Sequence, residues 1–100
     1  MKTLNIYGQE FYHTDAFIVG TKEALSALRA ALNKALDDDD DSVPVANLQI
    51  FASDGEGYSI NIICASDEDM EKLELPYNDQ DINPIESFTE LNKLHSRLKP

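Results

Sequence analysis

The stretch from Val45 to Ala65 constrains the fold more than any other, because it holds two runs of alternating apolar residues joined by Ser-Asp-Gly-Glu-Gly. Side chains in a strand alternate between two faces, so each run predicts a strand with one apolar face. Gly55 and Gly57 predict a tight turn, because glycine readily adopts positive φ angles. We therefore expect a β-hairpin. The residues expected on its apolar face are Leu48, Ile50, Ala52, Tyr58, Ile60, Ile62 and Cys64.

A helix is predicted between Thr21 and Asp37. Leucine recurs there at helical spacing, and three alanines widen the apolar stripe. Thr21 is a favourable N-cap, and the run of aspartates that begins at Asp37 opposes the negative C-terminal end of the helix dipole. We expect the stripe to be buried against a sheet. It consists of Ala24, Leu25, Leu28, Ala31, Leu32, Ala35 and Leu36.

The remaining predicted elements are shorter. The β-prone residues of Thr3–Tyr7 and Ala16–Val19 predict two N-terminal strands. Ser66, which precedes three acidic residues, predicts the start of a short helix. Asn83 is a candidate N-cap for a last helix over Pro84–Leu98. The order ββαββα predicts an α+β fold, an antiparallel sheet of about four strands with two main helices packed on one face.

Length and charge limit the class of protein. One hundred residues, 42% of them apolar, predict a single domain over residues 1–100. The net charge is −11, and the segment from Asp37 to Glu90 holds sixteen acids and one base. Binding to nucleic-acid phosphates or to an anionic membrane needs clustered Lys and Arg, so neither is expected. A single cysteine cannot form an internal disulfide, and Met1–Glu10 lacks the apolar core of a signal peptide, so a cytoplasmic location is expected.

The acidic segment is the main functional signal. An acidic face accelerates the encounter with a basic surface, so we expect these carboxylates to bind a basic protein, such as a toxin or a nucleic-acid-binding protein. A purely solubilising role is the alternative. Glu74 continues the same acidic run. The expected partner-binding residues are Asp37, Asp39, Asp41, Asp54, Glu56, Asp67, Glu68, Asp69 and Glu71.

No metal site is expected in the aspartate run. Asp37, Asp39 and Asp41 match the first three ligands of a calcium-binding EF-hand loop. However, Ser42 and Leu48 stand where that loop requires glycine and a bidentate glutamate. The run therefore predicts a solvated loop, as blocks of like charge usually form.

No catalytic residue and no cofactor are expected either. Asp54 and Glu56 share one turn but lack the supporting groups of an acid–base pair. Cys64 is expected to be a buried apolar residue, because the sequence places neither His13 nor His95 near it. A small hydrolase is thus the least favoured alternative.

A strand, a Gly-Thr pair and a helix rich in leucine and alanine follow one another in Ile18-Val19-Gly20-Thr21-Lys22-Glu23-Ala24-Leu25. Over Phe17–Ala65 this arrangement resembles small bacterial immunity proteins encoded beside polymorphic toxins. The resemblance implies a non-enzymatic inhibitor that binds and occludes a toxin domain. We therefore expect a non-catalytic acidic binding protein, monomeric or homodimeric. The alternative function is a self-associating structural module that uses the outer face of the hairpin.

Overall fold

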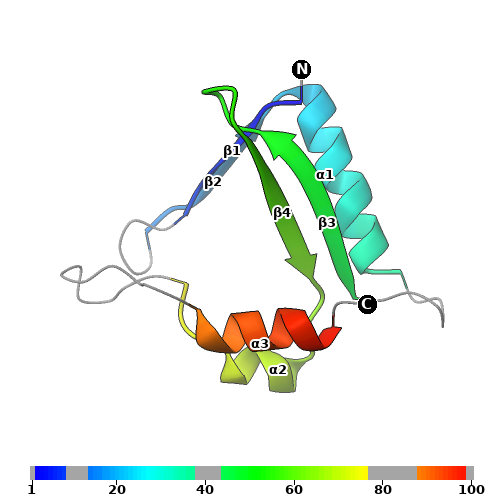
Figure 1. Cartoon of the computed structure of the whole chain (residues 1–100), viewed down its shortest axis with the longest axis vertical. Coiled ribbons are helices and arrows are strands. Elements are labelled where there is room, and N and C mark those ends of the chain that lie inside the picture. Colours follow the sequence, from blue (N-terminus) through cyan, green and yellow to red (C-terminus); the bar gives the residue numbers. More distant parts are fainter. Residues whose placement is uncertain (1, 9–13, 38–43, 77–87, 99–100) are drawn as a thin grey trace.

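A computed structural model of the chain describes residues 2–8, 14–37, 44–76 and 88–98. In this part of the chain the α+β class is confirmed, but the strands form two antiparallel two-stranded sheets, β1–β2 and β3–β4, instead of one sheet of four (Figure 1). The strands are β1 (Leu4–Tyr7), β2 (Phe17–Gly20), β3 (Val45–Phe51) and β4 (Gly57–Ile63), and the helices are α1 (Lys22–Ala35), α2 (Asp67–Lys72) and α3 (Thr89–Leu98).

The expected single sheet of four strands is not formed, because the contact between β1 and β3 is limited to one isolated bridge. Thr3 and Phe51 form an isolated parallel bridge, and the Phe51 amide donates to the Lys2 carbonyl at 3.2 Å. Phe51 is the last residue of β3, and the chain then reverses into the hairpin turn. β1 therefore continues past the end of β3, where no further strand residue is available for pairing.

The predicted β3–β4 hairpin is confirmed. Leu48 lies opposite Ile60 and Ile50 opposite Tyr58, so these side chains share one face, as expected. In the turn, Gly55 has a φ of +89°, which favours glycine. Gly57 differs from expectation: it is the first residue of β4 and pairs with Phe51, so it needs no positive φ angle.

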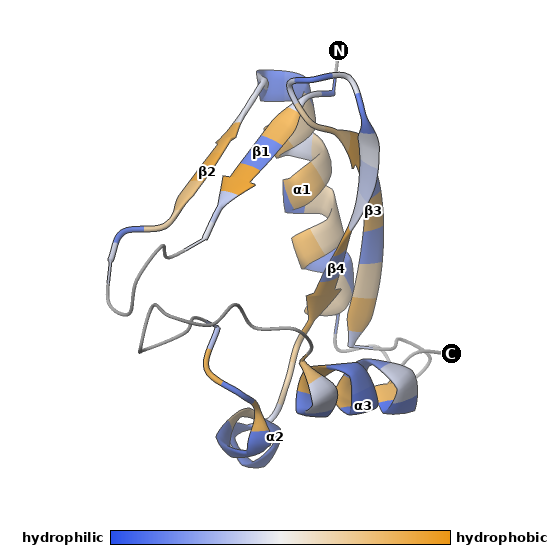
Figure 2. Cartoon of the chain, turned by 60° about the vertical axis from the view of Figure 1, so that its left-hand side comes forward, coloured by the Kyte–Doolittle hydropathy of each residue, from blue (hydrophilic) through white to orange (hydrophobic). Residues whose placement is uncertain are grey.

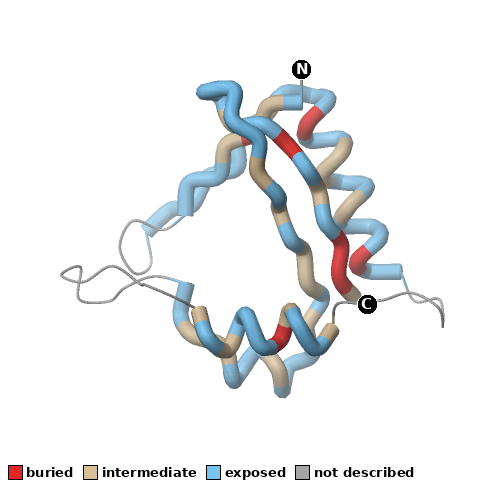
Figure 3. The backbone as a smooth tube through the Cα atoms, viewed as in Figure 1, coloured by how far each residue is buried: buried red, intermediate tan, exposed pale blue. Residues whose placement is uncertain are grey.

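The buried core lies where β1, α1 and β3 meet (Figure 3). Its centre is formed by Leu4, Ala24 and Ile50, all of which are almost fully buried. Leu28, Leu48, Tyr58 and Ile60 pack around this centre and are partly buried.

The helix stripe is only partly as predicted. α1 buries Ala24 and Ala35, whereas Leu25, Leu32 and Leu36 remain exposed. Alanine has no side chain beyond Cβ, so the backbone of α1 approaches the sheet most closely along the alanine side of the stripe, which leaves these leucines at its margin. Thr21 caps α1 as predicted, because its hydroxyl accepts from the Ala24 amide at 3.2 Å.

Residues at the start of the chain connect the two sheets. The Tyr58 hydroxyl donates to the Leu4 carbonyl at 2.6 Å. The side-chain amide of Asn5 donates to the Ser53 hydroxyl and accepts from the Ser53 backbone amide, each at 3.0 Å. The Thr21 amide donates to the Thr3 carbonyl at 3.0 Å, so the same segment also holds the start of α1.

The C-terminal helix does not pack on a sheet beside α1. α3 lies beside α2, near the end of β4 (Figure 1). Its described part begins at Thr89, and the predicted start at Asn83–Pro84 lies outside the described residues. Cys64, expected to be buried, is exposed. Its amide still donates to the Pro44 carbonyl at 2.8 Å, but it lies at the end of the hairpin opposite to the core cluster of Leu4, Ala24 and Ile50. The longest described helix, α1, has 14 residues, and none in the described ranges is long and apolar enough to cross a membrane.

Candidate functional site

The candidate site is built on α2, the short helix that carries four of the predicted partner-binding residues. Ser66 caps this helix, because its hydroxyl accepts from the Asp69 amide at 3.1 Å. Asp67, Glu68 and Asp69 occupy the first turn. Carboxylates there are favoured by the positive end of the helix dipole, so the acidic sequence and the helix stabilise each other.

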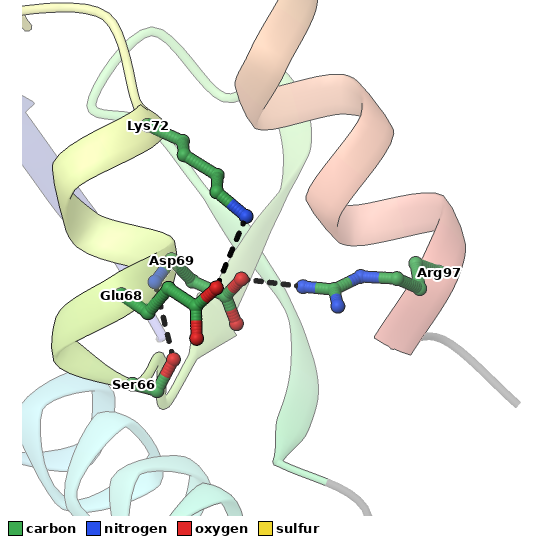
Figure 4. A network of polar contacts seen from close by, with 5 residues as sticks. All are labelled: Ser66, Glu68, Asp69, Lys72 and Arg97. Atoms are coloured by element: carbon green, nitrogen blue, oxygen red, sulfur yellow. Dashed lines mark hydrogen bonds and ion pairs between the residues drawn. The ribbon is translucent and has the colours of Figure 1, made fainter.

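Asp69 is turned inward, toward α3. Its carboxylate accepts from the Arg97 guanidinium at 2.7 Å, and its side chain is only 19% exposed (Figure 4). The hydrogen bond from Arg97 lowers the pKa of Asp69 below its usual value of 3.8. Asp69 therefore connects the two helices and is not an outward charge, unlike the role expected from the sequence.

Glu74 has a structural role that the sequence did not reveal. Its carboxylate accepts from the backbone amides of Glu90 and Leu91, the latter at 3.2 Å. These amides lie in the first turn of α3, where no helical carbonyl is available to them. The hydrogen bond from the Glu90 amide lowers the pKa of Glu74 below its usual value of 4.5. Glu74 thus caps α3 from outside the helix.

The other carboxylates of α2 point to solvent. Asp67 and Glu71 are exposed, and their carboxylates make no hydrogen bond or ion pair with any residue of the described ranges. Glu68 pairs with Lys72 at 3.4 Å, but both side chains are largely exposed, so water screens this pair strongly. We call Asp67, Glu68 and Glu71 the α2 acidic surface.

The hairpin turn forms a second, separate acidic region. Asp54 accepts from the Glu56 amide at 2.9 Å, so its carboxylate stabilises the turn. Glu56 is exposed. The turn precedes the seven residues of β4, and α2 follows them, so about 20 Å of extended chain separates the two regions.

The predicted residues that lie in the described ranges therefore do not gather into one face. Asp37 is exposed just beyond the C-terminal end of α1, and Asp39 and Asp41 lie outside the described residues. Among the predicted residues that the structure describes, Asp67, Glu68, Asp69 and Glu71 share α2, and Asp54 and Glu56 share the hairpin turn.

A groove of about 280 Å³ lies between α2 and α3. Three bases and two acids line this groove, and the sequence had indicated no role for the three bases. Each base has an acidic partner: Lys72 pairs with Glu68, Lys93 with Glu90 at 3.3 Å, and Arg97 with Asp69. When Glu68, which lies beside the groove, is counted with the two lining acids, three carboxylates balance the three bases, so the groove does not favour an anion. Its lining residues are Asp69, Lys72, Leu73, Glu90, Lys93, Leu94 and Arg97.

The candidate site therefore consists of exposed carboxylates that the capped helix α2 holds in place. Three or more His, Cys, Asp or Glu side chains positioned to hold a metal ion are not found among the residues that the structure describes. Carboxylates on a capped helix attract cationic groups without changing them chemically. No family model, curated protein or solved structure matches this chain.

Proposed function

We propose that this chain is a non-catalytic binding protein whose α2 acidic surface docks onto a basic surface of another protein. The observation that carries the proposal is the exposure of Asp67 and Glu71 without an intramolecular partner in the described residues. Their helix is held by the Ser66 cap and by the Asp69–Arg97 pair. The charges are therefore positioned before a partner arrives, which lowers the cost of ordering them on binding.

Electrostatics also favours a basic partner over other classes. The net charge of −11 repels nucleic acid and anionic lipid but attracts a cationic protein surface and accelerates its approach. The resemblance to immunity proteins makes a toxin domain with a basic groove the partner to test first. In that case the α2 acidic surface would occupy the groove and exclude the toxin's substrate.

The test compares two sets of neutral variants, one in each acidic region. The partner is recovered by affinity capture from the native host and its affinity for the chain is measured by calorimetry. Asp67→Asn, Glu68→Gln and Glu71→Gln together should weaken binding at least about tenfold, because close interfacial charges contribute strongly to affinity. Wild-type binding should also weaken as salt is added.

The control changes the other acidic region. Asp54→Asn with Glu56→Gln removes charge from the hairpin turn, while the substituted asparagine side chain keeps an oxygen that can accept from the backbone amide of residue 56. This control should bind with nearly wild-type affinity. Unchanged affinity in the α2 variant would refute the proposal, and a larger loss in the turn variant would move the site to the turn.

The alternative, self-association through the outer face of β3–β4, gains no support from the geometry. On that face the Asn47 side-chain amide donates to Asn61 at 2.9 Å, so these polar groups already pair within the hairpin. Gln49 and Ser59, opposite each other on the same face, are exposed polar residues. Phe51, at the end of β3, is 47% exposed on this face, but its neighbours there are polar, so the apolar area that a second copy could cover is small.

A further inference from the structure

The most apolar exposed surface of the described chain is the β1–β2 hairpin. Five large apolar side chains there are more than half exposed, with values from 51% for Ile6 to 57% for Phe17. In Figure 2, β2 lies at the outer margin of the molecule, with β1 between it and α1. Contiguous exposed apolar residues usually mark an interaction surface. These residues are Ile6, Tyr7, Phe17, Ile18 and Val19.

The outer edge of β2 also has backbone groups directed away from its partner strand. Because the Thr21 amide donates to the Thr3 carbonyl, the pairs Asn5–Val19 and Tyr7–Phe17 are the hydrogen-bonded ones. The amide and carbonyl of Ile18 therefore point outward, away from β1. In the described part of the chain, β2 has no strand partner other than β1.

We propose that β2 pairs antiparallel with β2 of a second copy around a two-fold axis at Ile18. The result is one four-stranded sheet in the order β1, β2, second β2, second β1. A two-fold axis perpendicular to a sheet requires one residue to face itself. An axis at Ile18 places Phe17 opposite Val19 of the second copy, whereas an axis at Val19 would place Phe17 opposite Thr21, and an axis at Phe17 would place Val19 opposite the charged Asp15. Ile18 is therefore the axis position that pairs the apolar residues of β2 with one another.

In this register, each exposed apolar residue of β2 has an apolar cross-strand neighbour in the second copy. Ile6 and Ile18 lie opposite each other on one face, so the dimer extends that row to the same two residues of the second copy. On the other face, Tyr7 and Phe17 are opposite each other, and Phe17 meets Val19 of the second copy. Side chains that are cross-strand neighbours on one face stabilise a sheet.

Charge favours a second copy at this place although the whole chain is acidic. Residues 1–22 contain two acids, Glu10 and Asp15, and two bases, Lys2 and Lys22, so this part is neutral. The pairing brings exposed Asp15 near the position where Lys22 of the second copy begins α1. β2 itself carries no charge and no proline, the residues that usually protect an edge strand from pairing.

The first test measures the mass of the full chain by sedimentation at increasing concentration. A monomer–dimer equilibrium in the micromolar range is expected, because the interface is small compared with that of a tight dimer. Ile18→Lys should raise the dissociation constant at least about tenfold, since two lysines would face each other across the axis. Ile6→Lys is the matched control: it changes an equally exposed residue of the same face, yet residue 6 is far from its own copy.

A chemical cross-link tests the register. Ile18→Cys in a Cys64→Ser background should form a disulfide dimer on mild oxidation, because Cα atoms of a hydrogen-bonded pair lie about 5.5 Å apart. Ile6→Cys in the same background should not, since three strand spacings, about 14 Å, separate the two residues. A chain that stays monomeric overturns the proposal. So does equal loss of dimer in the two lysine variants, which would indicate unspecific apolar association.

The proposed dimer and the proposed acidic docking site can be tested separately, because failure of one does not imply failure of the other. Added salt should strengthen the dimer, because it screens repulsion between two chains of charge −11, whereas it should weaken docking to a basic partner. Neutralising Asp67, Glu68 and Glu71 should leave the dimer intact or strengthen it. Loss of the dimer in that variant would contradict pairing through β2.

Discussion

The two ends of this molecule are held together by different forces. Around β1, α1 and β3, almost fully buried apolar residues form the core, and hydrogen bonds from Asn5 and Tyr58 reinforce it. Between α2 and α3, Leu94 is the buried apolar residue of the described chain. The contacts there are chiefly those of Asp69, which Figure 4 shows, and of Glu74. The first region depends on packing, which is insensitive to pH, whereas the second depends on ionised carboxylates. Three predictions test this difference.

The largest effect should come from the centre of the core. Leu4→Ala should lower the free energy of unfolding by about 2–5 kcal/mol, because it removes a fully buried side chain and leaves a cavity. Urea unfolding followed by circular dichroism measures the change. Leu32→Ala, at an exposed site on α1, should change stability by less than about 0.5 kcal/mol. Similar losses in both variants would show that the core is not centred on Leu4.

A smaller effect should come from the hydroxyl of Tyr58. Tyr58→Phe removes its hydrogen bond to the Leu4 carbonyl and should cost about 1 kcal/mol, because a partly buried acceptor loses its partner. Tyr7→Phe is the control, since its hydroxyl contacts the exposed side chain of Asn5. Equal stability of the two variants in urea would mean that Tyr58 does not connect the sheets.

The smallest effect should be confined to α2 and α3 and should depend on pH. The pKa values of Asp69 and Glu74 are lowered in the folded chain, so their contribution is complete above the ordinary values of 3.8 and 4.5. It is lost as the pH falls below these values toward the lowered pKa of each group. The protection factor of the Leu91 amide, which is the exchange rate of an unstructured amide at the same pH divided by the observed rate, should therefore fall on acidification before the protection factors of the core do.

A pair of variants checks the origin of that pH response. Glu74→Gln should accelerate exchange at Leu91 already at neutral pH, because the charge at the start of α3 is gone. Glu71→Gln, at an exposed carboxylate on the same segment, should leave this exchange unchanged. If acid opened α3 and the core together, the contrast between the two regions would be wrong.

Features that depend on neighbouring residues were predictable from the sequence. The alternation in Val45–Ala65, the cap at Thr21 and the cap at Ser66 are all local patterns, and the structure has each of them. The helix stripe was less predictable, because leucine and alanine share its pattern and only tertiary packing decides which side approaches β3. The prediction that Cys64 is buried was wrong because alternation fixes the face of a strand residue but not its distance from the core, which lies at the other end of the hairpin.

Features that depend on distant residues were not predictable. Asp69 and Glu74 look like neighbouring surface acids, but their partners lie 28 and 16 residues later in the chain. Likewise, the sequence predicts four strands but does not show that β1 passes the end of β3 after one bridge. The sequence thus predicted which acidic residues lie near one another on α2. It did not show that Asp67 and Glu71 face solvent whereas Asp69 faces α3.

The contacts of Leu4 have a consequence for the time course of folding. This residue packs against Ile50, and its carbonyl accepts from Tyr58, which lies 54 residues later. α1 and the β3–β4 hairpin can form from local interactions, but the core closes only after a long loop has been brought together, which slows folding. During synthesis, β1 can therefore be built into the core only after Tyr58 has emerged from the ribosome. In that interval the side chain of Leu4, which the folded chain buries completely, is exposed to other chains.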